Sequence, residues 1–204
     1  MIDLAVAAAA IAAVPVVGEI GVRHVRLSGE IARKLVHAGS GIVAATLPLL
    51  VSYGQIVAIA LTSALVMVLV HRFRLLAALN GVERVSYGEV WFPLGVAALA
   101  AFFPHAAAYV YGTLVLGLAD ASAAVVGVRL GRRRLPFVRG KTVAGSSAFC
   151  VTAVLVGAAV SGELSLGIVA AAGALTAAEA VTSRGADNFV VPVLAGLLAA
   201  QGLA

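Results

Sequence analysis

Long apolar stretches recur along the whole chain and are separated by short polar connections. A stretch of about 20 mostly apolar residues is long enough to cross the hydrocarbon core of a bilayer as a helix. Hydrophobic residues make up 62% of the chain and charged residues 11%, which is roughly half the charged share of soluble domains. We therefore expect an all-α, polytopic integral membrane protein with about 7–8 transmembrane helices, forming one domain over residues 1–204. The apolar stretches cover residues 2–21, 36–53, 54–71, 88–104, 106–129, 144–161, 164–183 and 187–203.

The basic residues are confined to alternate connections. All 14 Lys and Arg residues lie at or after the end of the first, third, fifth or seventh stretch, and the connections at 52–55, 103–107 and 161–165 contain none. Lys and Arg are enriched in the cytosolic loops of membrane proteins, so this alternation places all of them on the cytosolic side of the cell membrane. The same rule explains the net charge of +5, and no nucleic-acid partner is expected.

Acidic residues interrupt three of the apolar stretches near their cytosolic ends, at Glu19, Asp120 and Glu179. At a rise of 1.5 Å per residue, Asp120 lies about 13 Å and Glu179 about 7 Å inside the cytosolic end of its helix. Insertion of such a charge is unfavourable by about 2.5–3.5 kcal/mol, so the residue either pairs with a neighbouring helix or serves a function. Polar chemistry gathered at one face of the membrane suits a soluble cytosolic substrate that meets a lipid.

Small residues follow Asp120 at helical spacing, at Ala123, Gly127 and Gly131. This smooth face fits either a helix-packing ridge or the close approach of a nucleotide. Further on, Gly140-Lys141-Thr142 and Gly145-Ser146 stand at the expected start of the next helix. Backbone N–H groups at a helix start, a lysine and hydroxyls are the components of a phosphate site. The pattern is not a P-loop, which needs a glycine where Leu135 stands.

Read together, residues 120–145 resemble the CTP-binding motif DxxAxxxGxxxGx8KKTxEG of dolichol kinases, and the related KSxAG loop of phytol kinases and CTP-dependent diacylglycerol kinases. The correspondence covers 26 residues without a gap. Gly140 replaces the first Lys of the motif, which leaves Arg139 as a substitute. Ala144 replaces the Glu, as in the phytol kinase branch.

Three further elements resemble the same family, and each has a simpler alternative. "RKLVH" (33–37) resembles its RKxxH element, or anchors a helix at the interface. "SYGEVWFPLG" (86–95) resembles its GExxFP element, although Glu89 also suits a first helical turn. "EAVTSRGADNFVVPVL" (179–194) resembles its E…DNxxxP element, although Asp187 or Asn188 would also cap the last helix.

The resemblance implies transfer of a phosphoryl group from CTP to a lipid (isoprenoid) alcohol such as phytol, geranylgeraniol or dolichol, with membrane lipids around the site. It makes Asp120, Asp187 and Lys141 catalytic, with Asp120, Asp187 or His37 as the base. Mg²⁺ would be held by Asp120, Asp187, Glu179 and Glu89, because Mg²⁺ binds carboxylate and phosphate oxygens. The residues expected to bind the nucleotide are Ala123, Gly127, Gly131, Arg139, Gly140, Lys141, Thr142, Gly145, Ser146, Asn188, Arg33, Lys34 and His37.

Two other functions compete with this interpretation. Phosphatidate cytidylyltransferases resemble the chain in the D…KTxxGS loop, and such an enzyme would use CTP to activate a lipid phosphate. A transporter or assembly factor with Asp120 as a proton or ion site would explain the carboxylates but not the loop. A homodimer is also an open alternative to a monomer.

Overall fold

The computed structural model describes residues 2–25, 29–73, 87–136, 138, 140–182 and 184–202. Helices make up nearly all of this part of the chain, and each of the eight predicted apolar stretches overlaps a helix, so the all-α prediction is confirmed. A π turn, η2, joins α6 and α7 into one continuous helix, and a short 3₁₀ turn, η1, follows α2. The elements are α1 (Ile2–Val25), α2 (Gly29–Thr46), η1 (Leu47–Leu49), α3 (Tyr53–Phe73), α5 (Gly88–Phe102), α6 (Ala106–Leu114), η2 (Val115–Ala119), α7 (Asp120–Leu130), α8 (Val143–Ser161), α9 (Leu166–Val181) and α10 (Asp187–Ala200).

Three helical segments of the described chain are long and apolar enough to cross a membrane, namely Tyr53–Val70, Ala106–Leu130 and Val143–Ser161. Leucines on the outside of the bundle are well exposed, for example Leu65 at 62% and Leu155 at 63%. Apolar surface of this kind suits contact with lipid. An integral membrane protein is therefore supported, while the topology of about 7–8 spans and its orientation stay predictions. The shorter apolar helical segments are Leu4–Gly18, Gly88–Phe102, Leu166–Val181 and Asp187–Ala200.

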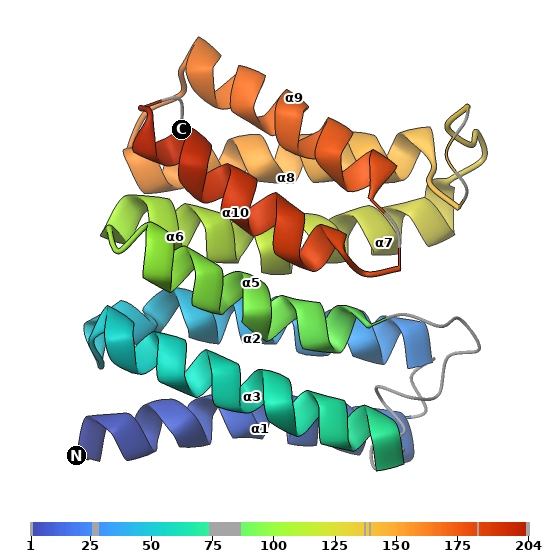
Figure 1. Ribbon diagram of the computed structural model, residues 1–204. Coiled ribbons are helices and arrows are strands. Elements are labelled where there is room, and N and C mark those ends of the chain that lie inside the picture. Colours follow the sequence, from blue (N-terminus) through green and yellow to red (C-terminus); the bar gives the residue numbers. More distant parts are fainter. Residues whose placement is uncertain are drawn as a thin grey trace.

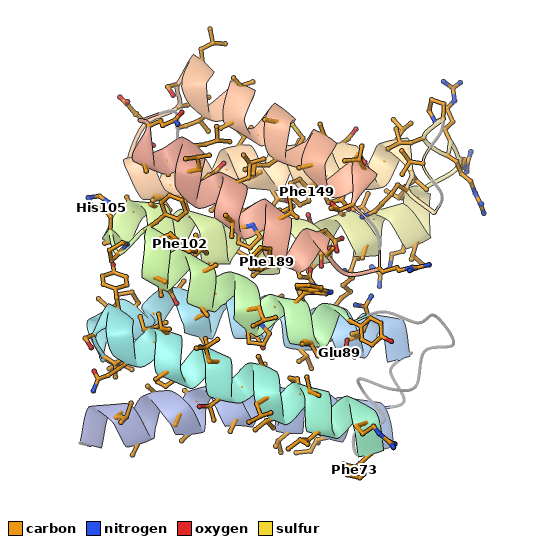
Figure 2. The ribbon with its side chains drawn as sticks, viewed as in Figure 1. Phe73, Glu89, Phe102, His105, Phe149 and Phe189 are labelled. Atoms are coloured by element: carbon orange, nitrogen blue, oxygen red, sulfur yellow. The ribbon has the colours of Figure 1, made fainter. Side chains whose placement is uncertain are left out.

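The helices lie side by side in one bundle, with α1 and α3 on one side and α8 and α9 on the other (Figure 1). Between them, α10 packs on α5 and α6, and α2 packs on α6 and η2. The α7–α8 and α9–α10 connections lie at the same end of the bundle as Glu89, and His105 lies at the opposite end (Figure 2). The polar residues near positions 120, 141 and 187 are thereby brought to one end.

The second helix differs from its predicted position. It covers Gly29–Thr46 where an apolar stretch at 36–53 was expected. Pro48 ends it, since the residue before a proline disfavours the α conformation, and the chain continues through the 3₁₀ turn. As a result, Lys34 and His37 lie within the helix and are buried at 8% and 7% exposure.

A close approach of two backbones holds α2 against η2. A Cβ atom on Gly41 would lie 2.6 Å from the Cα of Gly117, and one on Gly117 would lie 2.8 Å from the Cα of Gly41. Real Cβ atoms do not come so near, so this contact requires glycine on both helices. It brings Lys34 and His37 to the helix that carries Asp120.

Candidate active site

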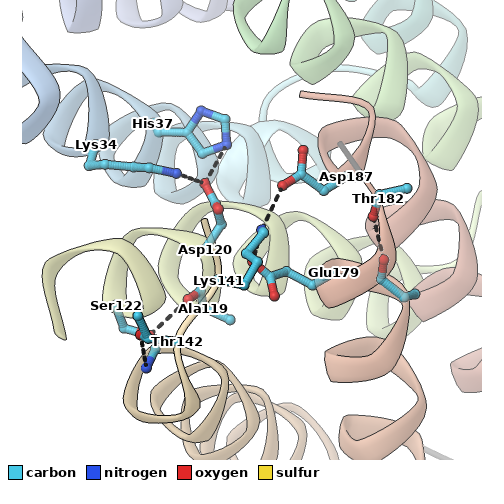
Figure 3. Close-up of polar contacts among 12 residues, drawn as sticks. Lys34, His37, Ala119, Asp120, Ser122, Lys141, Thr142, Glu179, Thr182 and Asp187 are labelled. Carbon is cyan, nitrogen blue, oxygen red and sulfur yellow. Dashed lines mark hydrogen bonds and ion pairs between the residues drawn. The ribbon is translucent and has the colours of Figure 1, made fainter. Parts of the chain in front are cut away.

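Asp120 is held between two side chains of α2 (Figure 3). The ammonium group of Lys34 donates a hydrogen bond to Asp120 Oδ2 at 2.5 Å, and His37 Nε2 lies 3.5 Å from the same oxygen. The His37 ring stands edge-on to Phe92 of α5 with ring centroids 4.5 Å apart, which fixes its orientation. All three polar side chains are buried. This pairing is what a purely structural role of Asp120 would require. A functional role depends in addition on the residues around the pair.

A second cluster of charges lies beside the first. Lys141, in the α7–α8 connection, donates to Glu179 Oε1 in the last turns of α9 and to Asp187 Oδ2 at the start of α10, at 3.4 Å. Burial lowers the pKa of Lys141, but the carboxylates of Glu179 and Asp187 outweigh burial and hold it above its ordinary value. Lys141 is therefore a permanent cation at this site.

The carboxylates of Asp120, Glu179 and Asp187 form one group, in which one oxygen of each lies within 4.8 Å of the others. Glu179 Oε2 is buried and has no hydrogen-bond partner in the part of the chain that the structure describes. Three oxygen donors at this separation, one of them unsatisfied, fit a hard divalent cation such as Mg²⁺. Glu89, which was also expected to bind the metal, lies in the first turn of α5, outside this group.

The phosphate-type loop is held in place by its own backbone. Val143 N–H donates to the carbonyl of Arg133, and Leu135 N–H donates to the carbonyl of Lys141, both at 3.0 Å. The Thr142 hydroxyl caps α8 by accepting from the Gly145 N–H at 3.1 Å. Gly140 has φ of 81°, a left-handed conformation that lysine adopts poorly. This backbone explains why glycine stands where the family motif has its first lysine.

The small-residue face packs two helices together, and the close approach of a nucleotide to it stays a prediction. A Cβ atom on Gly145 would lie 2.8 Å from the carbonyl oxygen of Ala123, and one on Gly127 would lie 3.1 Å from Thr142 Oγ1. Small residues therefore allow α8 to pack directly on α7. Ala123, Gly127 and Gly145 also line the cavity described next.

A cavity of about 230 Å³ brings most of the predicted residues together. Arg139 lies outside the described residues, Gly131 contacts Thr142 without lining the cavity, and His37 stands behind Asp120 and lines a second cavity. Ser146 Oγ is buried and, among the described residues, has no hydrogen-bond partner. The predicted residues on the wall are Arg33, Lys34, Glu89, Asp120, Ala123, Gly127, Gly140, Lys141, Thr142, Gly145, Ser146, Glu179, Asp187 and Asn188.

Several wall residues were not predicted, namely Ala124, Val128, Thr182, Arg184 and Gly185. The last three lie between Glu179 and Asp187 in the sequence. Their place between two predicted site residues could have indicated that they line the site. Arg184 in particular adopts a left-handed backbone, with φ of 57°, which is uncommon for a residue other than glycine.

The proposed cap of the last helix by Asp187 or Asn188 is wrong. Ala186 occupies the cap position and makes no side-chain cap hydrogen bond. Asn188 is buried and its amide donates to the carbonyl of Gly88 at 3.0 Å. It thereby ties the start of α10 to the start of α5, which leaves Asp187 directed at Lys141.

Comparison with known proteins finds a phytol kinase that is similar to this chain. Over 185 residues the chain is 32% identical to a phytol kinase of Synechocystis sp., and the alignment covers 85% of this chain and 79% of that protein. No protein-family model matches the chain, and no solved structure matches it.

Proposed function

The chain belongs to the phytol kinase family, and on this premise we propose that it is a CTP-dependent kinase of an isoprenoid alcohol, producing the lipid monophosphate and CDP. The observation that supports this most directly is the group formed by Asp120, Glu179 and Asp187, which shares a cavity with Lys141 and the start of α8. Carboxylates for a metal and cations for phosphates are the two requirements of phosphoryl transfer.

The phosphates of CTP are assigned to the loop and the first turn of α8. Lys141, Thr142, Gly145 and Ser146, from the loop and the first turn of α8, line the cavity. Charge accumulates on the phosphoryl oxygens during transfer, so fixed donors at this place stabilise the transition state. Ser146 Oγ, which has no hydrogen-bond partner among the residues that the structure describes, is a donor available for such an oxygen.

Asp120, Glu179 and Asp187 are assigned to hold Mg²⁺, which neutralises phosphate charge when bound. The acceptor hydroxyl attacks the γ-phosphorus, the bond to the β-phosphate oxygen breaks, and CDP leaves. Asp187 is our choice for the group that takes the hydroxyl proton, since its side chain is 16% exposed against 3% for Glu179. Lys34 and His37 keep Asp120 in position.

The active site is proposed to face the cytosol. Exposed Arg132, Arg133 and Arg134 lie in the α7–α8 connection, at the end of the bundle where the cavity opens, and basic loops stay cytosolic. CTP would enter from that side, and the lipid would come from the bilayer.

The test uses CTP labelled on the γ- or the α-phosphate, with Mg²⁺ and a panel of phytol, geranylgeraniol, dolichol, diacylglycerol and phosphatidate. The expected result is transfer of γ-label to an isoprenoid alcohol in the organic phase, without transfer of α-label. Transfer of α-label alone, onto a lipid phosphate and with release of pyrophosphate, would instead identify a cytidylyltransferase.

A further inference from the structure

A second cavity, of about 690 Å³, lies between α1, α2, α3 and α5. Its wall is mostly apolar and includes Ile11, Val36, Ala44, Met67 and Val96. In the described chain, α1 packs on α2 and α3 packs on α5, while α1 and α3 have little contact with each other. The cavity is therefore a groove open sideways toward the surroundings of the bundle, and we call it the α1–α3 groove.

One end of the α1–α3 groove meets the active-site cavity. Arg33 and Glu89 line both cavities. His37 lines the groove and contacts Asp120 on its other side. A molecule in the groove would thus present its end to the carboxylate group of the site.

The length of the groove and the polarity of its wall limit the kind of ligand that fits it. Its α2 wall extends from Arg33 to Leu47, which at 1.5 Å per residue corresponds to about 21 Å, or about two-thirds of a ~30 Å hydrocarbon core. The hydroxyls of Thr62 and Ser63 on its α3 wall donate to carbonyls of their own helix, at 2.8 and 2.9 Å. Both hydroxyls are therefore already hydrogen-bonded and need no polar group of the ligand. The groove suits a single extended hydrocarbon chain.

We propose that the α1–α3 groove binds the isoprenoid chain of the acceptor alcohol and places its hydroxyl next to His37, at the carboxylate group of Asp120, Glu179 and Asp187. This assignment rests on the proposed kinase function and deepens it. The chain enters sideways from the bilayer between α1 and α3.

Matched phenylalanine substitutions test the groove. Ser63 lines it, whereas Leu65, two residues along α3, points outward and is 62% exposed. Ser63→Phe should raise the KM for geranylgeraniol roughly tenfold or more, with the KM for CTP and turnover of short-chain geraniol little changed. Leu65→Phe should leave all three values near wild type. Ala12→Phe, inside the groove, and Ala13→Phe, outside it, give a second pair on α1. Equal effects within each pair would overturn the proposal.

Photo-crosslinking gives a readout that needs no catalysis. An isoprenoid alcohol with a diazirine near its tail is added to the wild-type protein in nanodiscs, and labelled peptides are identified by mass spectrometry. Labels on α1 and α3 that unlabelled alcohol displaces support the groove, even in a protein that does not use CTP. Labels elsewhere in a protein that does transfer γ-phosphate would overturn the groove and leave the kinase function standing. Displacement by phospholipid as readily as by alcohol would make it a site for bilayer lipid and overturn the proposal as well.

Discussion

The buried ion pair between Lys34 and Asp120 allows a quantitative test of the site. Both side chains are about a tenth exposed, at 10% and 11%. Asp120→Asn keeps the side-chain size but leaves the Lys34 ammonium buried without its partner. Lys34→Met leaves the Asp120 carboxylate buried without the Lys34 ammonium. Removing one member of a buried pair destabilises a protein by about 3–5 kcal/mol. His37 remains 3.5 Å from Asp120, so we expect Lys34→Met to lie at the lower end of that range.

The double variant Lys34→Met/Asp120→Asn should be more stable than the two single losses together predict, because neither charge remains. We expect a coupling energy of about 2–3 kcal/mol, within the range measured for residues in contact. The free energy of unfolding of all four proteins can be measured in detergent micelles with denaturant, by circular dichroism. Losses that add within about 0.5 kcal/mol would refute the pair as a contact of the folded state.

Measuring γ-phosphoryl transfer in the three variants distinguishes a structural role of the Lys34–Asp120 pair from a functional one. All three variants should lose γ-phosphoryl transfer by at least about 10- to 100-fold, since changes even in the outer shell of a metal site reduce activity by that much. The double variant should regain stability without regaining turnover. A stable double variant with wild-type turnover would mean that Asp120 only supports the fold.

Three further changes test the loop, the packing and the metal. Lys141→Ala should raise the KM for CTP at least about tenfold, as expected for loss of a partly buried charged donor. Arg133→Ala, on an exposed side chain of the same loop, should change it little, and equal effects would reduce the loop to a general basic patch. Gly145→Ala places a Cβ 2.8 Å from a carbonyl oxygen of α7 and should destabilise the protein by about 1–3 kcal/mol, while Gly173→Ala meets nothing within 4 Å and should not; thermal unfolding of both checks this. Chelation of divalent cations should abolish turnover and added Mg²⁺ should restore it, so full activity in EDTA would contradict the metal site.

Local features of the site could be predicted from the sequence. Asp120, Lys141 and the small residues between them lie in one segment of 26 residues, where spacing alone sets which side chains share a helix face. The apolar stretches likewise predicted the helices, because hydropathy reports burial in lipid directly. Glu179 was singled out because it interrupts an apolar stretch, and Asp187 through the family resemblance. Nothing in their spacing indicates that Lys141 lies between them.

Long-range features could not be predicted. Lys34 and Asp120 are separated by 86 positions, and their contact depends on the close approach of Gly41 and Gly117, which no periodicity reveals. The early start of α2 was missed for a related reason: Lys34 lowers local hydropathy, yet inside the bundle its charge is paired. The α1–α3 groove is formed by four helices, and no single segment of sequence carries its signature.

The π turn at Val115–Ala119 determines the direction in which the side chains of the following segment, α7, point around the helix axis. A π turn has a wider repeat than an α turn, and each residue of an α-helix advances the direction of the side chain by about 100°. Deleting one residue from this turn would preserve hydropathy and nearly preserve length, yet swing Asp120 about a quarter of a circle away from α2. The α6 half could keep its packing while the α7 half pointed its carboxylate elsewhere. The side-chain directions of α7 are therefore offset from those of α6, although the two form one continuous helix. A helical wheel drawn straight through the turn would assign Asp120 to the wrong face.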